Sequence, residues 1–107
     1  MPALHNEFPH KMESVTVRRC LNELMEAVRD DYRGVINDLQ GTWEGDTLHI
    51  SFRAYGFPIT ADVHVGHHVL EWDGYVPTNA SIVRAKVQRT IETKLAEMLR
   101  VGHRRAA

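Results

Sequence analysis

Residues 39–75 alternate between apolar and polar side chains over most of their length, and turn residues divide the stretch into four short runs. Alternation with a period of two is typical of a β-strand with one buried face, because successive side chains point to opposite sides. The stretch therefore predicts four antiparallel strands that share one apolar face. That face must be covered by other parts of the chain.

The first turn sets the first register. Gly45-Asp46 is a dipeptide that closes tight hairpins, so the run 39–44 is expected to pair with the run 47–52. In this register Trp43 lies opposite Leu48.

Two further turns complete the predicted meander. The stretch 54–58 is rich in turn residues, and its proline is tolerated only at a strand start or edge, so the third strand is expected over 59–65. We expect Gly66-His67 to form the next two-residue turn, followed by a fourth strand over 68–75. The side chains predicted to share the apolar face are Leu39, Trp43, Leu48, Ile50, Phe52, Ile59, Ala61, Val63, Val65, Leu70 and Trp72.

A helical pattern flanks the strands on each side. The first predicted helix runs from Ser14 or Thr16, either of which could be the N-cap, to about Tyr32, and Gly34 lies beyond its end. Its apolar side chains recur at spacings of three and four, which places them on one stripe: Val17, Leu21, Leu24, Met25, Val28 and Tyr32. Residues 35–38 could extend the first strand or form a loop.

The second predicted helix follows Pro77, with Thr78, Asn79 or Ser81 as its N-cap, and runs to about Val101 with Gly102 just past its end. Its apolar line consists of Val83, Val87, Ile91, Leu95, Met98 and Leu99. Two amphipathic helices and a one-sided sheet can bury their apolar faces together. The predicted fold is a two-layer α+β sandwich with the order α-β-β-β-β-α.

Length and composition bound the class of protein. A chain of 107 residues suits one domain, with residues 1–12 as an extended segment and 102–107 as a basic tail. It is 43% hydrophobic and 25% charged, and has no apolar run long enough to span a membrane. Its start lacks the order of a secretory signal, which favours a cytoplasmic location. The single cysteine, Cys20, flanks the apolar stripe of the first helix.

Charge is divided unevenly along the chain. From Asn79 onward seven basic residues face two acidic ones, a net of +5, so with a net charge of −1 the rest of the chain carries −6. The basic side chains of the second helix could therefore form a surface that binds a partner, or they could simply be solvated. No aromatic platform accompanies the charge, so we expect no nucleic-acid partner. The candidate surface consists of Arg84, Lys86, Arg89, Lys94 and Arg100.

Histidines and carboxylates meet on the polar face of the predicted sheet. In the expected registers His49 lies beside Asp62, with Thr42 on one side and Glu71 on the other, and His64 is one step along. Such a row could bind a divalent metal or supply a general base, or it could consist of surface cross-strand pairs.

The serines lack the glycine-flanked turn that exposes a nucleophile. We assign no catalytic residue, metal ligand or cofactor from sequence.

The order of these motifs resembles that of a known family. His10-Lys11-Met12, an amphipathic helix, the hairpin motif Trp-x-Gly-Asp-x-Leu at 43–48 and a terminal helix over 82–99 are similar to the small bacterial proteins called putative polyhydroxyalkanoic acid system proteins. The resemblance covers roughly residues 10–100. It implies an association with the synthesis, storage or granules of a carbon-reserve polyester, and it brings no catalytic residues.

Three hypotheses follow. The first is a non-catalytic, self-associating accessory protein that meets a protein partner or the polyester granule, which would make it cytoplasmic and granule-associated. The second is a domain that binds an apolar small molecule between helices and sheet, with Trp43, Phe52, Tyr55 and Trp72 as candidate lining residues. The third is an enzyme that uses the row of His49 and Asp62.

Overall fold

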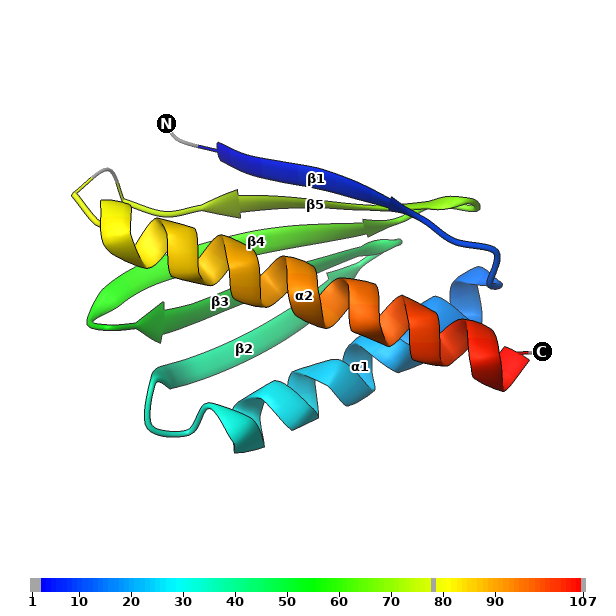
Figure 1. Ribbon diagram of the computed structural model, residues 1–107, viewed down its shortest axis with the longest axis horizontal. Coiled ribbons are helices and arrows are strands. Elements are labelled where there is room, and N and C mark those ends of the chain that lie inside the picture. Colours follow the sequence, from blue (N-terminus) through cyan, green and yellow to red (C-terminus); the bar gives the residue numbers. More distant parts are fainter. Residues whose placement is uncertain (1–2, 78, 107) are drawn as a thin grey trace.

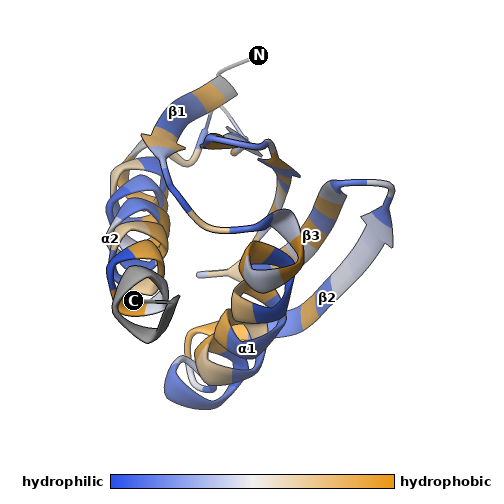
Figure 2. Cartoon of the chain, turned by 90° about the vertical axis from the view of Figure 1, so that its right-hand side faces the viewer, coloured by the Kyte–Doolittle hydropathy of each residue, from blue (hydrophilic) through white to orange (hydrophobic). Residues whose placement is uncertain are grey.

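Five antiparallel strands form one sheet in the spatial order β1-β5-β4-β3-β2, and both helices lie on the same side of it (Figures 1 and 2). The structure is a computed structural model that describes residues 3–77 and 79–106. We call the side of the sheet that faces the helices the covered face and the other side the open face. The elements are β1 (Ala3–Pro9), α1 (Ser14–Asp31), β2 (Ile36–Glu44), β3 (Thr47–Ala54), β4 (Phe57–Val65), β5 (Val69–Tyr75) and α2 (Ser81–Ala106).

The predicted four-stranded meander is present, and the structure adds a fifth strand. The segment expected to be merely extended forms β1, which pairs with β5 and makes the edge of the sheet. Its alternation is weak because Asn6 stands on the covered face between Leu4 and Phe8, where its amide donates to Glu92 of α2 at 2.9 Å. Paired residues of β1 and β5 are at least 60 positions apart along the chain, so no local turn indicates the pairing.

The first two hairpins agree with the sequence. Trp43 lies opposite Leu48, and Gly45 has the positive φ (59°) that the turn requires. The second turn is Tyr55-Gly56, with φ of 55° and 84°, so β4 begins at Phe57, two residues earlier than expected.

Pro58 is tolerated within β4 because of where its missing N–H would point. Successive residues of a strand donate to opposite neighbours, and Pro58 faces the side of β5. Since the pairing of β4 with β5 goes no further than Thr60 with Tyr75, no donor is missed there.

The third turn is displaced by one residue, and the predicted register there is wrong. The loop consists of His67-His68, and Gly66 still pairs, its N–H donating to the carbonyl of Val69 at 2.9 Å. Moving a two-residue loop one position along the chain shifts the register by two, so Asp62 lies opposite Asp73. A shift of two leaves every side chain on its predicted face but changes its neighbour.

His10 explains why the loop closes where it does. This histidine is buried, its Nε2 lies 2.9 Å from the carbonyl oxygen of Gly66, and its Nδ1 accepts from the N–H of Met12 at 3.2 Å. Its backbone N–H also donates to the carbonyl of His68 at 2.9 Å. Both ring nitrogens are used, so Nε2 carries the proton. The side chain thus ties the end of β1 to the β4–β5 loop.

The covered face is the predicted one. Among its members Leu39, Trp43 and Ile50 are partly buried, and β1 adds Leu4 and Phe8 to the same side. The buried members are Leu48, Phe52, Ile59, Ala61, Val63, Val65, Leu70 and Trp72.

The hairpin motif also attaches α1 to the sheet. The indole N–H of Trp43 donates to Asn22 of α1 at 2.9 Å, and the guanidinium of Arg18 lies 4.3 Å from the centre of the indole ring. The same guanidinium donates to the carbonyl of Gly45 at 2.8 Å. Helix α1 thereby contacts both the tryptophan and the turn, which gives the motif a structural role.

The ends of both helices differ from the predictions. Glu13, rather than Ser14 or Thr16, is the N-cap of α1, and its backbone carbonyl accepts the first helical bond. Helix α2 begins at Ser81 and continues through Gly102 to Ala106, so the expected basic tail is helical as far as that residue. The candidate cap Thr78 lies outside the described residues, as does Ala107.

Gly102 does not end α2 as the sequence predicts, and the structure gives it another role. A Cβ built at this position would lie 2.5 Å from the sulfur of Met12 and 3.6 Å from that of Cys20. The absence of a side chain at this position therefore lets α2 pass close to Met12 and Cys20, near the start of α1.

Of the connection over 35–38, which the sequence left open, Val35 belongs to a turn and the other three residues belong to a strand. β2 begins at Ile36, and an irregularity between Asn37 and Gln40 includes Asp38 with a φ of 57°. In the part of the chain that the structure describes, neither helix has a stretch apolar enough to cross a membrane.

Candidate functional site

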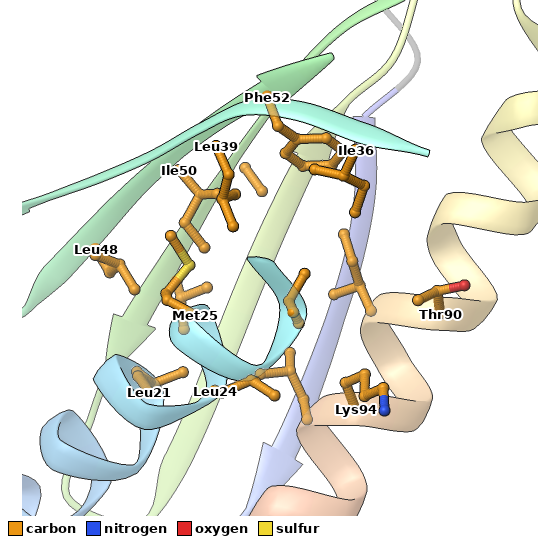
Figure 3. Close-up of a pocket in the computed structure, with 15 residues that line it drawn as sticks. Leu21, Leu24, Met25, Ile36, Leu39, Leu48, Ile50, Phe52, Thr90 and Lys94 are labelled. Atoms are coloured by element: carbon orange, nitrogen blue, oxygen red, sulfur yellow. The ribbon is translucent and has the colours of Figure 1, made fainter. Parts of the chain in front are cut away.

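The two helices diverge from their crossing point, and an apolar cavity of about 90 Å³ opens between them and the sheet (Figures 1 and 3). The cavity is open to the surface on one side, and its exposed wall is apolar. Its floor is formed by the covered face of β2, β3 and β4. The lining residues are Leu21, Leu24, Met25, Val28, Ile36, Leu39, Leu48, Ile50, Phe52, Ala61, Val63, Thr90, Ile91, Lys94 and Leu95.

The size of this cavity limits what it can hold. Sites for drug-sized ligands measure about 300–1,000 Å³, and an apolar cavity of about 150 Å³ accepts benzene. A volume of about 90 Å³ suits a short alkyl group, not a whole ligand.

Of the aromatic residues proposed to line a pocket, Phe52 lines the cavity. Tyr55 lines a neighbouring hollow of about 60 Å³, together with Lys86.

Cations of α2 stand beside these openings. The ammonium of Lys94 lies 5.8 Å from the centre of the Tyr32 ring, and that of Lys86 lies 5.3 Å from the Tyr55 ring. Arg89 and Arg100 are exposed. Among the residues that the structure describes, none of the five predicted surface cations, which include Arg84, forms an ion pair.

The open face carries the predicted row of polar residues, except that a different residue occupies one position. Thr42, His49 and Asp62 lie side by side as expected. The two-residue shift of β5 puts Asp73 where Glu71 was predicted, and β1 extends the row to His5. Sequence reasoning missed His5 because it did not recognise β1 as a strand.

His49 is held between two carboxylates. Its Nδ1 lies 2.7 Å from Asp62 and its Nε2 lies 2.9 Å from Glu44. The hydrogen bond to Asp62, followed by the one to Glu44, raises the pKa of His49 above its ordinary value.

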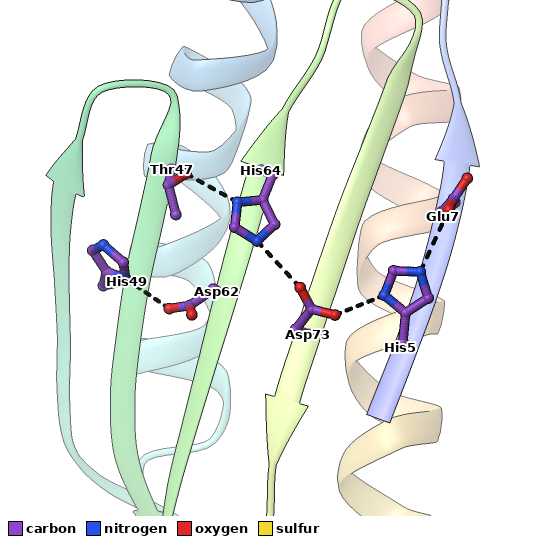
Figure 4. Close-up of polar contacts among 7 residues, drawn as sticks. All are labelled: His5, Glu7, Thr47, His49, Asp62, His64 and Asp73. Carbon is purple, nitrogen blue, oxygen red and sulfur yellow. Dashed lines mark hydrogen bonds and ion pairs between the residues drawn. The ribbon is translucent and has the colours of Figure 1, made fainter. Parts of the chain in front are cut away.

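His5 has a similar environment at the other end of the row (Figure 4). Its Nδ1 lies 2.6 Å from Asp73 and its Nε2 lies 3.4 Å from Glu7. The hydrogen bond to Asp73, with a smaller contribution from Glu7, raises the pKa of His5.

His64 and Glu71 occupy the adjacent row. The ring of His64 lies 3.0 Å from the hydroxyl of Thr47 and 3.2 Å from Asp73, so this carboxylate joins two histidines. Glu71 lies opposite both His64 and Glu7. The two predicted candidates are therefore neighbours, while Glu71 is separated from His49.

The open face is accessible to solvent. Its histidines and aspartates have side chains that are about a quarter to a half exposed. Chemically, the face can exchange protons with solvent and hold a cation between its carboxylates.

A comparison with models of protein families finds a match over most of the chain. The family model described as "Putative polyhydroxyalkanoic acid system protein" matches residues 4–99. The match begins within β1, so the strand that the sequence did not reveal belongs to the matched region. None of the curated proteins matches the chain.

Proposed function

The chain belongs to the family of putative polyhydroxyalkanoic acid system proteins, and from that premise we propose that it is a non-catalytic accessory protein of polyester storage. It acts by contact with the polyester granule or with a protein that coats the granule. The observation that carries this proposal is the open apolar cavity between α1 and α2.

The apolar stripe of α2 is buried in the core of the protein and is not free to contact a granule. Val83, Val87, Leu95 and Leu99 are buried in the core that α2 shares with the sheet and α1, so the helix cannot lay this stripe on a granule without leaving that core. A contact that keeps the fold intact must use an apolar surface that remains open. The cavity supplies one, because its walls include the half-buried side chains Leu24, Met25 and Val28.

The cavity is matched in size to a short alkyl branch. Polyesters of hydroxyalkanoic acids carry such branches along an ester backbone. A volume of about 90 Å³ holds roughly three groups of the size of a water molecule. At about 0.8 kcal/mol for each buried methylene, one insertion contributes about 2–3 kcal/mol. A single contact is therefore weak, and retention on a granule requires many copies of the protein or additional contacts.

Lys86 and Lys94 provide an additional contact. They stand next to the apolar openings, and their ring contacts with Tyr55 and Tyr32 leave ammonium protons for acceptors outside the protein. Ester carbonyls and terminal carboxylates of a polyester are such acceptors.

The test measures the fraction of protein that sediments with isolated polyester granules. The double variant Leu24→Ser/Val28→Ser makes the cavity polar, and we expect it to lower the bound fraction several-fold. Val15→Ser is the matched control, because Val15 is an exposed apolar residue of the same helix that does not line the cavity. Circular dichroism of each variant separates loss of contact from loss of fold.

Two results would contradict the proposal. One is a wild-type protein that stays in the soluble fraction of polymer-accumulating cells. The other is a double variant that sediments as well as wild type.

A second candidate function, binding of a soluble apolar ligand, depends on the same cavity. The small volume predicts that short alkyl acids or alcohols bind only in the millimolar range. Submicromolar binding of any such compound by calorimetry would favour the second candidate over the first.

A further inference from the structure

The seam between β1 and β5 brings three possible metal ligands together on the open face. The register places Glu7 opposite Glu71, and His5 lies two residues from Glu7 on the same face of β1. One ligand atom of each side chain lies within 4.8 Å of the other two. None of these elements overlaps the apolar cavity, so the site is independent of the proposed granule contact.

His5 is already oriented as a ligand. Asp73 accepts from its Nδ1 at 2.6 Å, which fixes the tautomer and leaves Nε2 to face Glu7. Metal-bound histidines usually donate their other ring nitrogen to a carboxylate in this way. The distance of 3.4 Å between Nε2 and Glu7 Oε2 fits two ligands of one tetrahedral ion, which at bond lengths of about 2.1 Å lie roughly 3.4 Å apart.

Glu71 lacks a compensating charge. Two carboxylates directly opposite each other on neighbouring strands repel. In the described part of the chain Glu71 makes no hydrogen bond or ion pair, and no lysine or arginine pairs with Glu7. A cation between the two side chains would replace this repulsion with attraction.

We propose that His5, Glu7 and Glu71 bind one divalent ion of the zinc class, with Asp73 as the residue that orients His5. One nitrogen and two carboxylate oxygens, completed by water, form a ligand set that zinc accepts. The ion would join the edge strand β1 to β5 and so stabilise the amino-terminal edge of the sheet.

His49, which lies in the same row of the open face as His5, supplies a matched control. Asp62 orients His49 as Asp73 orients His5, but among the residues that the structure describes Glu44 is the only further carboxylate that contacts its Nε2. A site that needs three ligands should form at His5 and not at His49.

The experiment is calorimetric titration of the full chain, prepared without a histidine tag, with zinc chloride and separately with magnesium chloride. We expect one zinc ion per chain, no comparable binding of magnesium, and a rise in the melting temperature with zinc. His5→Ala and Glu71→Gln should each weaken zinc binding tenfold or more, Asp73→Asn about 10–100-fold, and His49→Ala should leave it unchanged.

Glu71→Gln also distinguishes a metal site from a purely structural role. Without zinc this variant should be at least as stable as wild type, because it removes a like-charge pair, yet it should lose the zinc-dependent rise in melting temperature. An adventitious ion only is the conclusion if more than one zinc binds per chain, or if His5→Ala and His49→Ala weaken binding equally. Loss of zinc binding here with granule binding intact would separate this site from the proposed function.

Discussion

The two faces of the sheet are built from the same strands, yet they respond differently to an error in register. On the covered face Val63 and Trp72 are buried, and a shift of two residues would leave both side chains on that face. On the open face a shift of two residues replaces Glu71 with Asp73 beside Asp62. Burial depends on which side a residue points to, whereas a polar site depends on which residues are adjacent. A register shift of two residues therefore leaves the same residues in the core, but it changes which charged residues of the open face are neighbours.

The largest difference between the two faces is expected when a large side chain is removed from each of them. Trp72 is fully buried, and Trp72→Ala should cost about 3–5 kcal/mol of unfolding free energy, measured by urea denaturation. Tyr75→Ala, on the same strand and the open face, should cost under about 1 kcal/mol. Equal losses would mean that the two faces do not differ as described.

Adding one carbon to the covered face should have the next largest effect. A Cβ at Gly74 would lie 2.6 Å from the Trp72 ring, so Gly74→Ala should destabilise the protein by about 1–3 kcal/mol. Gly34→Ala is the control, because no atom lies within 4 Å of a Cβ there. A melting temperature for Gly74→Ala equal to that of wild type would show that the ring is free to move.

The contribution of the open face to the free energy of unfolding should depend on pH. The folded pKa of His49 is raised by Asp62 and Glu44, so its protonated form stabilises the fold. That contribution is fully present below the unfolded pKa of about 6.5, and it is lost as pH rises through the raised folded value. His49→Ala should flatten the dependence of unfolding free energy on pH in this interval. Ser51→Ala, a non-titrating change on the same strand, should leave the slope as in wild type.

Much of the fold follows from local patterns. The Gly45-Asp46 turn fixes the first hairpin, and the stripe of Val17 and Leu21 identifies α1. Errors arose where a residue serves a distant partner. Gly102 looks like a helix terminator but makes room for Met12, and the His67-His68 loop is held by His10. Such contacts leave no periodic signal in the neighbouring sequence.

The candidate sites were less predictable for the same reason. His49 and Asp62 could be paired because one short hairpin joins their strands. His5 could not, since β1 pairs with β5 across most of the chain. The apolar cavity depends on how far α1 and α2 diverge, which neither helix encodes alone.

The sequence by itself determined which side of the sheet the residues of β2 to β5 occupy and which stripe of each helix is buried, because periods of two and about 3.6 are local properties of the chain. The tertiary structure alone decided the fifth strand, the register of β5 and the spacing of the helices. These depend on contacts between distant segments, and a register shift of two residues leaves the hydrophobic pattern unchanged.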